Sequence, residues 1–387
     1  MTMQNWPTGK VILPIEKLHN HLRGKKIALM MNATARDNDG AALIDVIPAY
    51  TDVEVSFFIG MEHGVRGDLY AGDPGLQSVD KKTGIPIVNL YDYPDWRPPV
   101  EPLKAVDAVV FCAQDTGVRH WTYTPWMLTL MDAAAKAGCE VVIPDRPNPL
   151  GGAVEGNATE EQYRYIELLN GFGYPLRHGM TIGELALMYN ETQHIGCKLT
   201  VLPMENYRRD MPYEETGLPW LPPSPNIPTV DSCYYFNATG LLQAASVSKG
   251  IGTTTPFQYI GAPWMDGQKV ADALNSRNLP GVFCIEKYYK ARYMGEHDVL
   301  CDGILILLKD KKAFRPVQFQ LNLIDVLSSL YPKDFVLDVH YLAVPRMGTA
   351  DVVDSVKQGK SVLWLEEKWG RESAEFELAR KPYLIYE

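Results

Sequence analysis

The residues best suited to chemistry lie in polar segments that each follow an apolar, strand-like run. In the first, FIGMEHGVRGD (Phe58–Asp68), the run Val53–Ile59 ends at a glycine and is followed by Glu62, His63 and Arg66. Burial at a strand end raises the pKa of a glutamate and suits it to general acid catalysis. Glu62 is therefore a candidate acid, with His63 and Arg66 as candidate substrate ligands. A structural histidine and a Glu62–Arg66 ion pair fit the same residues.

The second segment, QDTGVRHWTY, follows the apolar run Val106–Ala113 and contains Asp115, Arg119 and Tyr123. Asp115 could act as a catalytic carboxylate or could cap the helix that follows. Arginine on such a loop is suited to bidentate recognition of a carboxylate, so Arg119 is a candidate substrate ligand. Tyr123 could offer its hydroxyl to a substrate or pack in the core.

The third segment, DRPNPLGG, follows the run Cys139–Ile143 and places Asp145, Arg146 and Asn148 on a loop stiffened by two prolines. Polar groups on stiff loops can be held in a fixed geometry, as catalysis requires. Asp145 is a candidate catalytic residue, and Arg146 and Asn148 are candidate substrate ligands. An internal Asp–Arg pair that shapes the turn is the alternative. His178, before a later helix, is a further candidate ligand.

Elements that would position these loops alternate along the first two-thirds of the chain. Strands are expected at 26–31, 53–59, 86–91, 106–113, 139–145 and 198–204, and helices at 40–49, 121–137, 159–170 and 181–192. Thr181 and Glu184 form a capping box at the start of the last helix. This pattern predicts an α/β fold with a Rossmann-like parallel sheet, in which the loops leaving the strand ends converge on one crevice.

A change of texture marks the second part of the chain. Residues 203–263 are rich in proline, glycine and aromatic side chains, which favours an ordered loop packed over the first domain. Helices at 268–277 and 317–331, strands at 281–288 and 303–308 and a helical C-terminus follow. We predict a catalytic domain at 1–263 and a smaller α/β C-terminal domain at 264–387, because an ordinary single core does not reach 387 residues.

Composition narrows the possible partners. The net charge of -10 argues against nucleic acid and anionic membranes, so an anionic substrate would need local arginines. The sequence has neither a glycine-rich nucleotide motif nor a GxSxG elbow, and its six cysteines stand apart without zinc spacing. We therefore expect no cofactor and no metal. Without a recognisable signal peptide or membrane span, a cytoplasmic location is expected. The sequence does not indicate an oligomeric state.

Six ordered motifs carry a resemblance to a known family: MEHGVRGD, QDTGVRHWTY, PDRPNPLGG, RHGMTIGELA, GLPWLPPSPNIPT and GTTTPF. Together they resemble the NamZ-type exo-β-N-acetylmuramidases across nearly the whole chain. The resemblance implies a Rossmann-like active-site domain, a smaller C-terminal domain and release of terminal N-acetylmuramic acid from peptidoglycan-derived glycans. Its substrate would be a small carbohydrate. The family's proposed catalytic glutamate matches Glu62.

Roles for the other matching residues follow from chemistry. Asp115 or Asp145 would activate water or stabilise positive charge, and the substrate's own acetamido group is an alternative to both. Arg119 or Arg146 would bind the lactyl carboxylate, and Trp121 or Trp220 would offer an apolar face to the sugar ring.

The sequence departs from the resembled pattern at two positions. Gln243 and Ile251 stand where the family usually has glutamate and arginine. A relative that binds sugars or muropeptides without hydrolysing them is therefore the alternative hypothesis. A nucleotide-dependent α/β enzyme is a third, resting on fold analogy alone.

Overall fold

The first unit is built on a six-stranded parallel sheet. The computed structural model describes residues 11–387 except 71, 74, 76, 165–170 and 338–342. In spatial order the strands are β3 (Ile87–Asn89), β2 (Glu54–Gly60), β1 (Lys26–Met31), β4 (Ala108–Cys112), β5 (Glu140–Pro144) and β6 (Lys198–Leu202). All neighbouring pairs run parallel. This is the strand order of a Rossmann-like sheet, so the predicted fold class is confirmed.

Helices cover both faces of this sheet because its strands are apolar on both sides. On β1, Ile27, Leu29 and Met31 belong to one core cluster, whereas Ala28 and Met30 belong to another. Such alternation follows from the two-residue period of a strand. The first cluster is completed by α1 (Ile15–Leu22) and α2 (Leu43–Val46), and the second includes α3 (Val100–Leu103), α4 (Tyr123–Ala137) and α5 (Ile182–Thr192).

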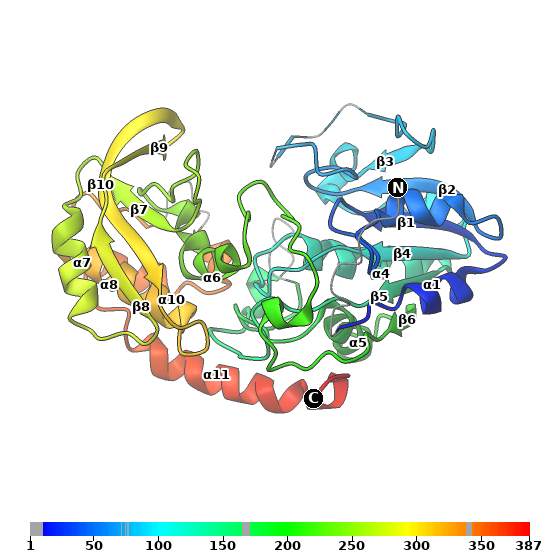
Figure 1. The fold of residues 1–387 in the computed structure, drawn as a ribbon. Coiled ribbons are helices and arrows are strands. Elements are labelled where there is room, and N and C mark those ends of the chain that lie inside the picture. The colour runs from blue at the N-terminus through cyan, green and yellow to red at the C-terminus, as the bar shows by residue number, and fades with distance from the viewer. Residues whose placement is uncertain (1–10, 71, 74, 76, 165–170, 338–342) are drawn as a thin grey trace.

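The second unit contains a smaller antiparallel sheet (Figure 1). Its strands are β7 (Tyr259–Ala262), β8 (Val282–Glu286), β9 (Tyr289–Tyr293) and β10 (Glu296–Leu308), and β10 pairs with each of the others. Its helices are α6 (Val230–Thr239), α7 (Gly267–Asn275), α8 (Pro316–Leu330), α9 (Ala343–Met347), α10 (Asp351–Lys357) and α11 (Leu365–Ala379). The boundary predicted at residue 264 falls after β7, which already belongs to the second sheet.

Of two helices predicted from the sequence, one is confirmed and one is not. The capping box of α5 is present, because the Thr181 hydroxyl accepts from the Glu184 backbone and the Glu184 carboxylate accepts from the Thr181 backbone. The helix expected at 159–170 is wrong in its described part, where Glu161–Tyr163 forms a single 3₁₀ turn, and residues 165–170 lie outside the described chain. Further 3₁₀ turns are at Ile47–Ala49, Leu90–Asp92, Pro94–Trp96, Tyr213–Thr216, Gly240–Ala244 and Lys381–Tyr383.

Within the described ranges, no helix is long and apolar enough to cross a bilayer. The same residues contain no group of three or more His, Cys, Asp or Glu side chains placed to hold a metal ion.

Helix α11 runs beneath both units and ties them together (Figure 1). The Ser373 hydroxyl donates to the Gly156 carbonyl, and the Arg380 guanidinium donates to the carbonyls of Gly152 and Gly179. The chain end then returns to the first sheet. There the Tyr386 hydroxyl donates to Asp145 Oδ2 at 2.8 Å and accepts from the Met204 amide at 3.1 Å.

Tyr386→Phe should destabilise the protein without changing its fold. The substitution leaves a buried carboxylate and a backbone amide each short of one partner, which costs about 1–3 kcal/mol. Urea denaturation should show this loss in the free energy of unfolding. The exposed Tyr70, replaced by Phe, is the control and should stay within about 0.5 kcal/mol of wild type. Equal stability of the Tyr386 variant and wild type would contradict a stabilising role for the hydrogen bonds of Tyr386 to Asp145 and Met204.

Candidate active site

A cavity of about 360 Å³ is lined by residues from both units. The first unit contributes the loop after β2, with Glu62 and His63, and the loop before α4, with His120, Trp121 and Thr122. The second contributes α6, the 3₁₀ turn that follows it, and Arg346 from α9. Two of the three loops predicted to converge thus supply one wall. The second wall comes from the later part of the chain, where the sequence had pointed to Gln243 and Ile251.

Glu62 is held in the cavity by residues at the start of α4. The Thr122 hydroxyl donates to Glu62 Oε2 at 2.7 Å. The Tyr123 hydroxyl donates to the Pro223 carbonyl at 2.7 Å and lies 3.3 Å from the Glu62 carbonyl. Among the described residues Oε1 of Glu62 has no hydrogen-bond partner. One carboxylate oxygen is therefore fixed, and the other is available to a ligand.

Burial, and then the negative charge of Glu62, raise the pKa of Tyr123 well above its usual value. Tyr123 therefore stays a neutral donor at physiological pH. It touches the backbone of the candidate acid from the buried core, so it positions Glu62 rather than lining the cavity itself.

His63 lines the cavity from a tight turn. Its backbone has φ 69° and is followed by Gly64 at φ 72°, so two consecutive residues are left-handed. Its Nδ1 lies 3.0 Å from the Leu69 carbonyl. Because a carbonyl can only accept, Nδ1 must carry a proton, and in the neutral ring Nε2 is then an acceptor.

Aromatic side chains form much of the remaining wall. Trp121 packs edge-on against Phe236, and Phe236 packs edge-on against Phe257. Trp96 lies at the rim and is 43% exposed. Such surfaces suit the apolar face of a sugar ring, as predicted for Trp121. Trp220, the other predicted aromatic, is not among the cavity residues; its indole donates to the Ile227 carbonyl.

His120 is a polar cavity residue that was not predicted from the sequence. It is 8% exposed, lines the cavity and makes no hydrogen bond of ordinary geometry through either ring nitrogen to the described residues. Burial, followed by the charges of Arg119 and Arg346, lowers its pKa to about 3. The ring is therefore neutral at physiological pH. Gly240 makes room for it, since a Cβ there would lie 2.8 Å from His120 Nε2.

The predicted arginines lie outside the cavity lining. Arg66 pairs with Asp80 and Asp45, and its hydrogen bond holds the pKa of Asp80 well below the usual range. Arg119 is wholly buried and donates to the carbonyls of Asn157, Tyr174 and Met347. Both arginines therefore stabilise the fold through these contacts.

Arg146 is likewise engaged in the first unit, donating to the Arg36 carbonyl at 3.2 Å. Arg346 is the arginine that lines the cavity. It stands alone in the segment AVPRMG, so no motif could have identified it from the sequence.

Asp115 and His178 form a buried pair behind the cavity. Asp115 Oδ2 lies 3.1 Å from His178 Nε2 and accepts from the Gly117 amide at 2.9 Å. Its Oδ1 lies 3.3 Å from the Thr124 hydroxyl at the start of α4. Neither residue is among the cavity residues, and their contacts shape the loop before α4.

The polar side chains of the loop DRPNPLGG also point into the protein interior. Asp145 is fully buried and accepts from the hydroxyls of Thr181 and Tyr386 and from the Gly183 amide. Burial raises the pKa of Asp145 to about 6. Asn148 donates to the Met180 carbonyl and accepts from the Leu150 amide. Both side chains are thus satisfied within the protein and do not line the cavity.

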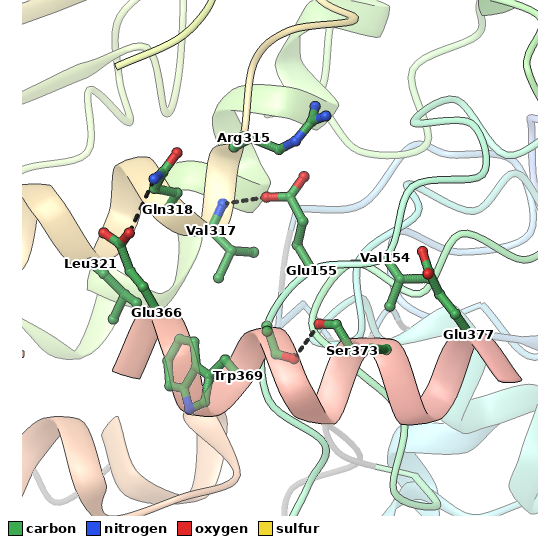
Figure 2. Close-up of a pocket in the computed structure, with 13 residues that line it drawn as sticks. Val154, Glu155, Arg315, Val317, Gln318, Leu321, Glu366, Trp369, Ser373 and Glu377 are labelled. Atoms are coloured by element: carbon green, nitrogen blue, oxygen red, sulfur yellow. Dashed lines mark hydrogen bonds between the residues drawn. The ribbon is translucent and has the colours of Figure 1, made fainter. Parts of the chain in front are cut away.

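A separate cavity of about 370 Å³ lies between the first unit, α8 and α11 (Figure 2). Two of its three carboxylates are engaged, and the third, Glu377, is exposed to solvent. Glu155 pairs with Arg177 and accepts from the Val317 amide, and Glu366 accepts from the side chains of Gln318 and Asn322. Because Glu62 keeps a carboxylate oxygen available, the cavity around Glu62 is the better candidate for catalysis.

Gln243 and Ile251, where the sequence departs from the resembled pattern, both line the cavity around Glu62. Both belong to the wall contributed by the second part of the chain. The departures therefore change the surroundings of a ligand without touching the residues that hold Glu62.

Comparisons with known proteins match both parts of this chain to one family. The family described as exo-β-N-acetylmuramidase NamZ matches through its N-terminal domain at residues 27–231 and its C-terminal domain at 234–386. The peptidoglycan β-N-acetylmuramidase NamZ of Bacillus subtilis (strain 168) is 36% identical over 366 residues, covering 94% of this chain and 88% of that protein.

Crystal structures of two DUF1343 family proteins from Bacteroides fragilis NCTC 9343 have similar folds. One has a TM-score of 0.89 at 31% identity and covers 98% of this chain and 100% of its own. The other has a TM-score of 0.75 at 28% identity, and the match covers 97% of this chain and 99% of that protein. With both family domains matched and a relative above 30% identity across nearly its full length, this chain belongs to the NamZ family of exo-β-N-acetylmuramidases.

Proposed function

We propose that this protein is a glycoside hydrolase that releases terminal N-acetylmuramic acid from peptidoglycan-derived glycans, with Glu62 as the general acid. The observation that carries the proposal is the placement of Glu62, which enters a two-walled cavity with Oε2 held by Thr122 and Oε1 available. Family membership and the name of the Bacillus subtilis relative support the reaction and the sugar.

In the proposed reaction Glu62 protonates the glycosidic oxygen as its bond to the anomeric carbon breaks. Among the described cavity residues Glu62 is the sole carboxylate, since Asp115 and Asp145 are engaged elsewhere. This arrangement favours attack on the anomeric carbon by the carbonyl oxygen of the substrate's own acetamido group. Water then opens the resulting ring, and the Glu62 carboxylate takes up a proton from that water.

The remaining cavity residues would bind the sugar. Trp121 and Phe236 offer apolar surface to the ring, and His63 offers a hydrogen-bond acceptor at Nε2. Thr122 and Tyr123 would act through Glu62 as positioning residues.

Glu62→Gln should abolish most activity, because glutamine cannot donate a proton to the leaving oxygen. On a muramic acid–glucosamine disaccharide we expect kcat/KM to fall about 10³-fold, within the range for general acid catalysis. A nitrophenyl glycoside needs less protonation, so its loss should be smaller. Glu54→Gln, at the exposed opposite end of β2, is the matched control. Binding of the disaccharide with wild-type activity in the Glu62 variant would refute the acid role, and binding without turnover in the wild type would indicate the non-hydrolysing alternative.

Thr122→Val should lower kcat while leaving KM nearly unchanged. The substitution keeps the side-chain shape but removes the hydroxyl that fixes Glu62, so kcat should fall about 10-fold for one lost charge-assisted hydrogen bond. Thr122→Ser should restore most of it. Thr129→Val, on the buried part of α4, removes a hydroxyl bonded to a backbone carbonyl outside the cavity and is the control. Steady-state kinetics that show a change in KM alone would argue against positioning.

The anomeric form of the first product tests participation by the acetamido group. Two inversions at the anomeric carbon should release β-N-acetylmuramic acid, which proton NMR can identify before mutarotation. Release of the α-anomer would instead require direct attack by water and a base from another residue.

A further inference from the structure

Arg346 places a positive charge on the wall of the cavity opposite to the loop that carries Glu62. It comes from α9 of the second unit, whereas Glu62 follows β2 of the first. Apart from the two histidines, these are the ionisable side chains among the described lining residues. A ligand between the two walls thus meets an acid on one side and a guanidinium on the other.

The charge of Arg346 acts on buried groups, where water screens electrostatic interactions only weakly. Burial is the main cause that lowers the pKa of His120 to about 3, and the charge of Arg346 lowers it further. Lys249 is 8% exposed, with its ammonium 5.8 Å from the ring centroid of Phe257, which lines the cavity. Burial, and then Arg346, lower the pKa of Lys249 to about 7. Buried groups beside the cavity therefore respond to Arg346, and so would a buried anion.

Arg346 also sits on an anchored segment. The next residue, Met347, uses its carbonyl to accept from the Arg119 guanidinium at 2.6 Å and from the Asn157 amide at 2.8 Å. Gly348 follows with φ 70°, and a Cβ there would lie 3.0 Å from Arg119 Nη2. The first unit thus holds the end of α9 in place, so the backbone that carries Arg346 is ordered before a ligand binds.

We infer that Arg346 binds the lactyl carboxylate of the terminal sugar and is the residue that selects N-acetylmuramic acid over uncharged amino sugars. The inference rests on the proposed function, because that function puts a carboxylate-bearing sugar in this cavity. A guanidinium matches a carboxylate with two parallel hydrogen bonds, which an ammonium cannot reproduce. Arg119 then acts as a positioning residue for Arg346.

The test measures binding of free sugars by calorimetry. The ligands are N-acetylmuramic acid, its methyl ester, which lacks the negative charge, and N-acetylglucosamine. The proteins are wild type, Arg346→Gln, Arg346→Lys and Arg371→Gln, the last an exposed arginine on α11 that pairs with Glu367. Circular dichroism and thermal unfolding establish that each variant is folded.

We expect Arg346→Gln to weaken binding of N-acetylmuramic acid about 10- to 100-fold, which corresponds to about 1.4–2.7 kcal/mol. Binding of the methyl ester should change less than about threefold. Arg346→Lys should be intermediate for the acid, and Arg371→Gln should match wild type. Kinetics on aryl glycosides of the acid and its ester should show the same split in kcat/KM.

Two results would overturn the inference. One is unchanged binding of the acid by Arg346→Gln, and the other is an equal loss for acid and ester. If Arg346→Gln does not fold, Arg346→Lys and the wild-type preference for acid over ester carry the test, and equal wild-type affinities for the two overturn it. A wild type that binds the acid through Arg346 but hydrolyses no glycoside would refute the proposed function and leave this assignment standing.

Discussion

The buried guanidinium of Arg119 is the constraint on which the rest of the site depends. A charge in the protein interior is costly unless it is fully hydrogen-bonded. The Arg119 guanidinium donates to the carbonyls of Asn157 and Tyr174 from the first unit and of Met347 from the second, and these bonds offset part of that cost. Burial lowers the pKa of Arg119 to about 10, so it remains charged at neutral pH. The two units are therefore joined by contacts that neither can satisfy alone.

The residues after Arg119 put this junction next to the chemistry. His120 and Trp121 line the cavity, Thr122 holds the Glu62 carboxylate, and Tyr123 lies against the Glu62 backbone from the first turn of α4. One short segment thus joins the units and positions the candidate acid. On its far side, the contact with Met347 fixes the helix that carries Arg346. The segment Arg119–Tyr123 therefore helps to set the relative position of the two cavity walls.

The sequence predicted the sheet and the convergence of two of the three loops, because both follow from periodicity and from the geometry of parallel strands. It placed Glu62 and His63 directly after the strand β2, and both line the cavity. It could not tell which way a side chain points within a loop, so Arg119, Asp115 and Asp145 were candidates although the structure turns them inward. Residue type and spacing are the same for an arginine that binds a substrate and one that binds carbonyls.

On the second wall, Arg346 and the residues of α6 were not predicted, for a different reason. Arg346 lies far from Glu62 in the chain, and only the packing of α9 against the first unit brings them to one cavity. The aromatic residues of α6 were recognised as ordered, but the helix itself was missed because its apolar residues surround it rather than following one face.

The split origin of the cavity has an evolutionary consequence. The candidate proton donor Glu62 and the residues that hold it belong to the first unit, whereas Gln243, Ile251 and Arg346 belong to the second wall. Substitutions on that wall can diversify sugar preference among descendants of one ancestral hydrolase while the hydrolytic machinery stays intact. The segment Arg119–Tyr123 should tolerate fewer substitutions, because a change there would affect both the junction of the two units and the position of Glu62. Divergence within the family should accordingly concentrate on one side of the same pocket.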